Sequence, residues 1–316
     1  MIGVRPEKKK LGGMPLEKRL MLDASLPVLT GQVLWLDAAD ATTIFDADGD
    51  DAATGTGGGN DGFSGSVARW QDKSVSGFDV TSGGGAQPSY GVDTKNGNNV
   101  LTFDGTTDRL SNAGAVISGS AYTAFIVYER DSPTAREAAF ELGGGGSRNG
   151  LFLNNSGTDK YNYYLNGSFY NSSASYTVGN YNLVSITQAG TIVLVDVNNV
   201  NQIFASTATR TTTTGIYIGD DSTSGDFLQG KIAEVIIYDR ALNSFEEHDV
   251  ENYLASKWGM TIPNTDATLS TNAGSTVDEL SNGNITNLVA TDADNSDTML
   301  CYTITSNPTY GYLYNS

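Results

Sequence analysis

Residues 121–128 read Ala-Tyr-Thr-Ala-Phe-Ile-Val-Tyr, a run of mostly β-branched and aromatic side chains. Such residues favour β-strands, and Gly, Asn and Asp turn residues bound this run and others like it. The other runs lie at 33–36, 99–103, 183–186, 192–195 and 215–218. Strands that recur from Gly31 to about Pro263, with no helix between them, predict an all-β fold, an antiparallel β-sandwich of jelly-roll type. The same pattern excludes a parallel α/β fold.

One helix is expected near the end of this sandwich. Ser244 with Glu247 three residues later matches a capping box, and Gly259 supplies a C-terminal stop. An apolar stripe at helical spacing is expected to pack on the sandwich: Val250, Leu254 and Trp258. The single histidine, His248, has no second histidine near it in the sequence, so we expect a surface position rather than a metal site.

The composition is acidic, with 36 Asp and Glu against 18 Lys and Arg and a formal net charge of -18. Most of the acids are Asp, whose short carboxylate suits turns and calcium ligation. Nucleic acid is not expected as a partner, because this charge repels phosphates. The one cysteine, Cys301, leaves no intramolecular disulfide and no thiolate metal site.

The chain is expected to divide into three segments. Residues 1–26 form a basic leader that holds six of the 18 basic residues and is expected to be disordered or processed. Residues 27–263 form the sandwich, and residues 264–316 form a Thr-, Asn- and Asp-rich linker with a partial second β unit. No run approaches the roughly 20 apolar residues of a transmembrane segment, and the N-terminus lacks the apolar core of a secretory signal. Export would therefore use another signal.

Two segments make the sandwich more specific. Residues 231–242 (KIAEVIIYDRAL) and 253–259 (YLASKWG) resemble the closing strand and terminal helix of laminin-G-like, concanavalin A-like lectin domains. Residues 33–38 (VLWLDA) and 101–110 (LTFDGTTDRL) fit the same family, and together the pieces bracket about three quarters of the chain. The resemblance implies a concanavalin A-like jelly roll, a family whose members often bind calcium or sugars at edge loops.

Both ends of the chain carry further resemblances. Residues 277–279, 288–295, 300–305 and 308–313 resemble the first half of a bacterial cadherin-like repeat of the proteoglycan-core type, with an immunoglobulin-like fold. That resemblance implies calcium ligands at Glu279, Asp292 and Asp294, and further repeats in a longer protein. Near the N-terminus, residues 16–24 resemble the LEPR-XLL segment of large repetitive bacterial surface proteins, with Lys18 in place of the usual Pro. A short amphipathic basic segment is the alternative.

Residues 46–51 read Asp-Ala-Asp-Gly-Asp-Asp and place carboxylates at every second residue. This spacing aims several oxygens at one cation, so the predicted calcium ligands are Asp46, Asp48 and Asp50. Asp51 at position six and Gly57 at position twelve exclude an EF-hand. A calcium loop of another design, completed by Asn60 and Asp61, and a solvated insertion both remain open. Further candidate calcium ligands, with plain turn roles as the alternative, are Asp104, Asp108, Asp220, Asp221 and Asp226.

A stretch rich in tyrosine and asparagine predicts a carbohydrate platform, because aromatic faces stack on sugar rings and amides bind hydroxyls. The candidate ligand-binding residues are Asn154, Asn155, Tyr161, Tyr163 and Tyr164, in a stretch that also holds Asn162, Phe169, Tyr170 and Tyr176. Strand alternation predicts that half of these rings face the core, so a structural role is the competing interpretation.

Three classes of function compete. The favoured class is a non-enzymatic, calcium-dependent binding module of a large bacterial adhesin, extracellular or on the cell surface, that recognises a glycan or a surface protein. The second class is a glycoside hydrolase on the same sandwich; retaining hydrolysis needs two carboxylates about 5 Å apart, usually written Glu-x-Asp-x-x-Glu. Residues 137–141 lack the central Asp, Glu234 stands alone on its strand, and one histidine gives no Ser/His/Asp triad. A ligand-free structural spacer is the third class.

Overall fold

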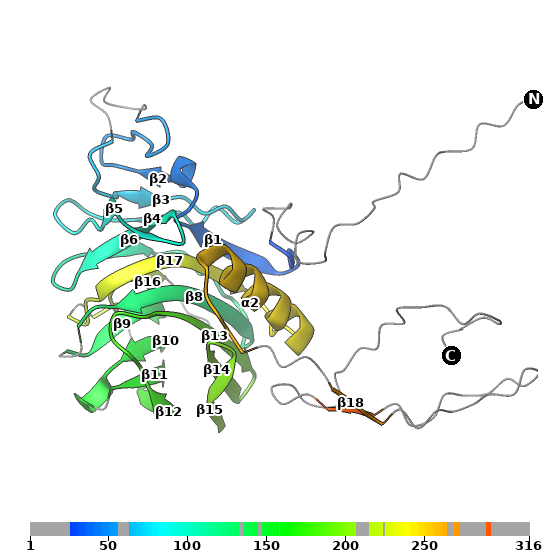
Figure 1. Cartoon of the computed structure of the whole chain (residues 1–316). Helices are drawn as coiled ribbons and strands as arrows, with labels where there is room; N and C mark the ends of the chain where they lie inside the picture. Colours follow the sequence, from blue (N-terminus) through cyan, green and yellow to red (C-terminus); the bar gives the residue numbers. More distant parts are fainter. Residues whose placement is uncertain are drawn as a thin grey trace, which may run out of the picture.

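The computed structural model describes residues 26–55, 63–132, 135–144, 147–157, 159–206, 215–223 and 225–263, and the backbone of two short strands beyond them. The described residues between 26 and 263 form two antiparallel sheets stacked face to face, with one helix on the outside (Figure 1). The predicted all-β jelly-roll sandwich with one helix near its end is confirmed.

The first sheet, sheet A, has eight strands among the described residues. Its order from one edge to the other is β15 (Val200–Ser206), β14 (Ile192–Val197), β13 (Tyr181–Ala189), β8 (Tyr122–Arg130), β17 (Gln229–Tyr238), β6 (Asn98–Asp104) and β5 (Ser89–Lys95), and β1 (Gln32–Asp37) also pairs with β17.

The second sheet, sheet B, has nine strands within the same residues. Its order is β12 (Ser168–Ser175), β11 (Lys160–Leu165), β10 (Ser147–Leu153), β9 (Glu137–Gly144), β16 (Ile216–Ile218), β7 (Leu110–Asn112), β4 (Val80–Thr81), β3 (Arg69–Trp70) and β2 (Ile44–Phe45). Two 3-10 turns join strands, η1 (Ala41–Thr43) and η2 (Asn155–Gly157). Strands β12 and β2 are therefore the opposite edges of sheet B.

The main core lies between the two sheets, where side chains alternate along each strand. On β10, Leu151 and Leu153 are fully buried and belong to this core, and Tyr163 on β11 joins them. Strand β8 is buried on both faces, since residues 122–128 are all buried. Its second face is also covered, so the expected alternation of polar and apolar side chains is absent there.

Helix α2 (Ser244–Trp258) covers that outer face of sheet A (Figure 1). Its stripe of Val250, Leu254 and Trp258 is buried as predicted, and Gly259 ends the helix in the left-handed conformation. The predicted cap is wrong by one residue: Asn243 is the N-cap, and its capping box partner is Glu246. Asparagine caps a helix as well as serine does, and here its side chain accepts the N–H groups of the first turn.

A buried carboxylate fastens α2 to the sheet. Glu234 on β17 accepts the indole N–H groups of Trp35 and Trp258, each at 2.7 Å. The ammonium of Lys257 lies 2.7 Å from the same carboxylate, and the Tyr253 hydroxyl lies 3.3 Å from it. Glu234 is thus a structural group beneath the helix and reaches no solvent.

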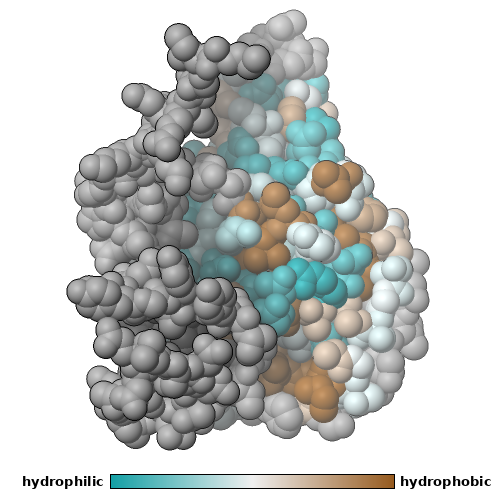
Figure 2. All heavy atoms as spheres, turned by 90° about the vertical axis from the view of Figure 1, so that its right-hand side faces the viewer, coloured by the Kyte–Doolittle hydropathy of each residue, from teal (hydrophilic) through white to brown (hydrophobic). Residues whose placement is uncertain are grey.

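The large exposed apolar side chains of the described residues are spread over several elements. Figure 2 shows, on the face that corresponds to the right-hand side of Figure 1, small apolar groups separated by polar surface. Such scattered groups are normal for a protein surface and mark no docking area by themselves. Among the described residues, no helix combines the length and apolarity that crossing a bilayer requires.

Beyond residue 263 the described backbone consists of β18 (Thr268–Thr271) and β19 (Val289–Thr291), which pair antiparallel. Residues 1–25 of the expected leader, with the LEPR-XLL-like segment, lie outside the described residues, as do Glu279, Asp292 and Asp294. Leu26, the last residue assigned to the leader, is described and buried in the core. The cadherin-like repeat and its calcium ligands stay predictions.

Candidate functional site

Three aromatic rings meet on the outer face of sheet B, the face that points away from sheet A. Phe152 on β10, Tyr164 on β11 and Phe169 on β12 pack together, with ring centroids 4.8 to 5.6 Å apart. Phe152 is buried beneath the other two, whereas Tyr164 and Phe169 are half-buried. Tyr164 and Phe169 therefore present aromatic surface to solvent at this edge of the sheet.

The three tyrosines predicted to bind a sugar do not share one face of sheet B, because neighbouring side chains on β11 point to opposite faces. Tyr163 lies in the core, where its hydroxyl donates to Gln188 at 2.6 Å. Tyr161 is also buried and packs edge-on against Tyr176, with centroids 6.0 Å apart. Of the three tyrosines predicted to bind ligand, only Tyr164 lies on the outer face.

The predicted asparagines mainly hold the turn between β10 and β11. The Asn154 side chain donates to the Ala135 carbonyl at 3.3 Å and accepts the N–H of Asp159 at 3.2 Å. Asn155 donates its backbone N–H to Asn162 Oδ1 at 2.9 Å, and Asn162 donates to Asn171 Oδ1 at 2.8 Å. Asn171 is exposed on β12, so its amide borders the aromatic cluster on the solvent side.

An arginine lies beside these rings, between two carboxylates. It was not among the candidate binding residues predicted from the sequence. Arg148 on β10 has its Nη2 atom 2.5 Å from a carboxylate oxygen of both Glu141 and Asp221. Its guanidinium lies 5.1 Å from the ring centre of Tyr164. Burial raises the pKa of Glu141, and Arg148 opposes that effect. Period-two alternation in residues 147–153 and 160–165 could have placed Arg148, Phe152 and Tyr164 on one face.

We call Tyr164, Phe169, Asn171 and Arg148 the outer platform. It offers two half-exposed aromatic rings, one exposed amide and a guanidinium fixed by ion pairs. Chemically, this arrangement can cover an apolar ring face and hydrogen-bond to hydroxyl groups around it.

The predicted calcium ligands around residues 220–226 are paired with arginines. Asp226 accepts from Arg136, with the closest approach 2.7 Å, and Asp220 lies 3.6 Å from Arg109. Burial raises the pKa of both aspartates. A guanidinium already supplies the positive charge that a cation would bring, so calcium binding at these residues stays a prediction without further support.

Asp104 and Asp108 organise their own turn. Asp104 accepts the backbone N–H groups of Thr106, Thr107 and Asp108 at 2.8 to 3.1 Å. Partial burial raises the pKa of Asp104, but the hydrogen bond from the Thr106 hydroxyl and these backbone hydrogen bonds outweigh it and hold that pKa well below the usual value. Asp108 is buried and lies near that charge, and both effects raise its pKa to about 6. The geometry is that of a turn, and the metal role of this pair is untested.

The acidic cluster after β2 consists of Asp46, Asp48 and Asp50. Among the described residues it is the one group whose three carboxylates bring oxygens within 4.8 Å of one another. Asp46 and Asp50 are buried, and Asp48 is exposed. Asp46 accepts the N–H groups of Asp50 and Ser64, each at 2.9 Å. Burial raises the pKa of Asp46, but hydrogen bonds from Asp48 and from these backbone groups outweigh it and hold that pKa below its usual value.

This acidic cluster could hold a metal ion, because its donors are carboxylate oxygens, the ligands that hard cations such as calcium prefer. It follows β2, whereas the outer platform lies on β10 to β12 at the other edge of sheet B. Eight strand-to-strand steps of about 4.8 Å each separate the two edges along the sheet. A cation held by the cluster would therefore lie far from a ligand on the platform. Asn60 and Asp61 lie outside the described residues.

The other carboxylates considered for catalysis, Glu137 and Glu234, are buried and inaccessible to a substrate. Glu137 is buried, with Arg130 at 2.8 Å, and burial raises its pKa to about 7 against the effect of that arginine. Glu234 lies beneath α2. His248 on α2 is half-buried.

Two curved antiparallel sheets with this topology form a concanavalin A-like β-sandwich of the laminin-G-like kind. The family model described as the concanavalin A-like lectin/glucanases superfamily matches residues 103–246. No curated protein matches the chain.

Among solved structures, a Trypanosoma rangeli sialidase in complex with sialic acid aligns with a TM-score of 0.52 at 15% sequence identity. The alignment covers 75% of this chain and 35% of the sialidase, so the chain spans about a third of that protein. Domain 4 of AbnA, an extracellular GH43 arabinanase from Geobacillus stearothermophilus in complex with arabinotriose, aligns at 13% identity with a TM-score of 0.47, covering 70% of this chain and 97% of that domain. At these identities the likeness concerns the fold alone.

Proposed function

We propose that this chain is a non-enzymatic carbohydrate-binding module, and that the outer platform is its ligand site. The observation that carries the proposal is the pair of half-exposed rings of Tyr164 and Phe169, whose centroids lie 4.8 Å apart. Asn171 and Arg148 flank the rings with hydrogen-bond donors. The fold supports the same class of ligand, because the matching superfamily is described by its lectins and glucanases.

The chemistry of the platform suits a sugar. One face of a pyranose ring carries C–H groups that pack on an aromatic ring, and its rim carries hydroxyls that need hydrogen-bonding partners. Arg148 is held in place by Glu141 and Asp221, so little side-chain entropy is lost when a hydroxyl binds there.

The same arrangement argues against hydrolysis at this site. Retaining glycosidases use two carboxylates about 5 Å apart, one of them a nucleophile open to the sugar. Glu141 and Asp221 approach a similar separation, but both are buried and the Arg148 guanidinium lies against both. A nucleophile or an acid in that position has no access to a glycosidic bond. We therefore propose that binding is not followed by cleavage.

We propose that calcium is a structural ion in this protein. Asp46, Asp48 and Asp50 would hold it, and it would neutralise the repulsion between three close carboxylates and stiffen the segment after β2. Given the separation between the two edges of sheet B, calcium would act on stability and would not ligate the sugar.

An adhesive role at the bacterial surface is the broadest part of the proposal. The acidic composition suits a soluble extracellular module, and the resemblance of the C-terminal residues to a cadherin-like repeat suggests repetition in a longer protein. A surface protein is the alternative ligand.

A glycan array tests the proposed function. The wild-type chain and the Tyr164→Ala variant are compared, with Phe245→Ala as the control because Phe245 is an exposed ring on α2. We expect Tyr164→Ala to lower affinity about tenfold, because it removes a stacking surface, and Phe245→Ala to leave affinity unchanged. Absence of retention on every glycan would favour the spacer function. Release of reducing sugar from a retained glycan would instead favour a hydrolase.

A further inference from the structure

The open edge of the sandwich lies next to the outer platform. There β12, the edge strand of sheet B, runs beside β15, the edge strand of sheet A. The two strands belong to different sheets, and Gln202 on β15 connects them. Its Oε1 atom accepts the hydroxyl of Ser173 at 2.8 Å and the N–H of Ala174 at 2.9 Å. This Gln202 bridge divides the edge into two clefts.

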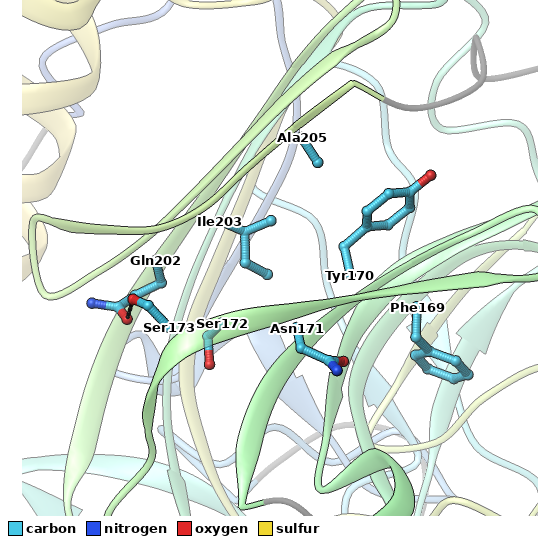
Figure 3. Close-up of a pocket in the computed structure, with 8 residues that line it drawn as sticks. All are labelled: Phe169, Tyr170, Asn171, Ser172, Ser173, Gln202, Ile203 and Ala205. Carbon is cyan, nitrogen blue, oxygen red and sulfur yellow. Dashed lines mark hydrogen bonds between the residues drawn. The ribbon is translucent and has the colours of Figure 1, made fainter.

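The first cleft has a volume of about 440 Å³, and every described residue that lines it is uncharged. Figure 3 shows Phe169 and Asn171 on one side of β12 and Tyr170 on the other, toward Ile203. Because side chains from both sides of β12 line it, the cleft passes over the edge strand. Through Phe169 and Asn171 it is continuous with the outer platform.

The second cleft, of about 600 Å³, begins on the other side of the Gln202 bridge and shares Gln202 with the first. Asparagine side chains are frequent in its lining, and Lys95 is the one charged side chain among the described residues there. The lysine ammonium lies 5.2 Å from the ring centre of Tyr181. Together the clefts follow β12 from residue 169 to residue 175, six steps of about 3.3 Å, or about 20 Å.

We infer that this edge groove, the two clefts joined at Gln202, binds an unbranched, uncharged oligosaccharide several units long. The inference rests on the proposed function and extends it from the platform to a particular class of ligand. The chain carries a net charge of -18, yet the groove is lined almost entirely by amides, hydroxyls, aromatic rings and aliphatic groups. Uncharged hydrogen-bonding groups suit sugar hydroxyls. Lys95, the one charged side chain among the described lining residues, lies over the Tyr181 ring, so the lining holds no cluster of cations that would bind a chain of carboxylates. A groove longer than one sugar ring suits a chain.

The test compares chain lengths and one isosteric substitution. Calorimetry measures the affinity of the whole protein for gluco-, manno- and arabino-oligosaccharides of one to six units, and for oligogalacturonate as the charged probe. Gln202→Glu keeps two oxygens that can accept from Ser173 and Ala174, so the bridge and the fold are retained. It removes one donor and adds a negative charge. Gln87→Glu is the matched control, since Gln87 precedes β5 at the other edge of sheet A.

We expect affinity for at least one neutral series to rise with length, and Gln202→Glu to lower the affinity of its longest member about tenfold. Gln87→Glu should change nothing. The groove inference is overturned if Gln202→Glu leaves the length dependence intact, or if oligogalacturonate binds as tightly as the neutral chains. In either case a loss of binding in Tyr164→Ala would still support the platform. If the wild-type protein binds no saccharide of any length, both proposals fail.

Discussion

Replacing Glu234 by glutamine tests how α2 is held on the sandwich. The substitution preserves shape but converts one carboxylate oxygen into an amide that donates. Four donors converge on the native carboxylate, from Trp35, Trp258, Tyr253 and Lys257. In either orientation of the glutamine, the new amide faces a donor and at least one indole N–H or ammonium loses its acceptor.

The cost can be worked from these contacts. Hydrogen bonds to a charged group contribute about 1.5 to 3 kcal/mol each, and breaking a buried ion pair costs about 3 to 5 kcal/mol. Two features reduce that cost. Lys257 keeps a second partner, Asp37 at 2.5 Å, and burial together with the charge of Asp37 raises the pKa of Glu234, so its ionised form is already disfavoured. We therefore expect a loss of about 3 kcal/mol in the free energy of unfolding.

Thermal unfolding followed by circular dichroism measures this effect. For a domain of this size, 1 kcal/mol shifts Tm by about 2 to 4 °C, so Glu234→Gln should lower Tm by about 10 °C. Glu246→Gln is the control, because glutamine also completes a capping box and the Glu246 ion pair with Arg240 is partly exposed. A change in Tm no larger than that of the control would refute the reasoning. It would mean that the cost of burying the carboxylate cancels its four hydrogen bonds.

Three further predictions concern the cation, pH and the backbone of sheet B. In the double variant Asp46→Asn, Asp50→Asn, Tm should no longer respond to calcium or to a chelator. Its affinity for saccharide should stay within about twofold of the wild-type value. An effect of the chelator on the saccharide affinity of this variant would contradict the placement of calcium at these aspartates. Asp108 has a raised pKa of about 6, so its protonated form stabilises the fold below about pH 4 and this stabilisation is lost as pH rises through 6. The Tm of Asp108→Asn should therefore rise relative to that of the wild type between about pH 4 and 7. A difference in Tm that stays constant over this range would contradict the prediction. Gly150→Ala should lower Tm by several degrees, since its Cβ would lie 2.8 Å from the Cα of Glu141, whereas Gly84→Ala, with open space around it, should not.

The sequence predicted the elements of this fold well because strand and helix signals are local. Each of the six expected strand runs falls on an observed strand, although the runs 121–128 and 215–218 begin one residue before β8 and β16, and the α2 stripe is buried. The cap was misplaced because Asn243 and Ser244 are both good caps, and backbone conformation alone selects between them.

The candidate site was only partly predictable. Alternation warned that half of the tyrosines face the core, but it did not say which, because the face of a strand depends on what packs against it. Arg148 and Asp221 are 73 positions apart, and no local pattern joins them. Glu234 stood alone in the sequence for the same reason: its partners Trp35 and Trp258 come from opposite ends of the sandwich sequence.

The sequence by itself determined that the chain builds an all-β sandwich with one closing helix, because composition, turn residues and periodicity act within a few residues of each other. Only the tertiary structure decided which face each side chain occupies. It placed Tyr164 outside and Tyr163 inside, paired three of the candidate calcium ligands with arginines, and left Asp46, Asp48 and Asp50 together at the opposite edge from the platform. The physical reason is that ion pairing and burial depend on distances between strands, and these are set when the two sheets and α2 pack.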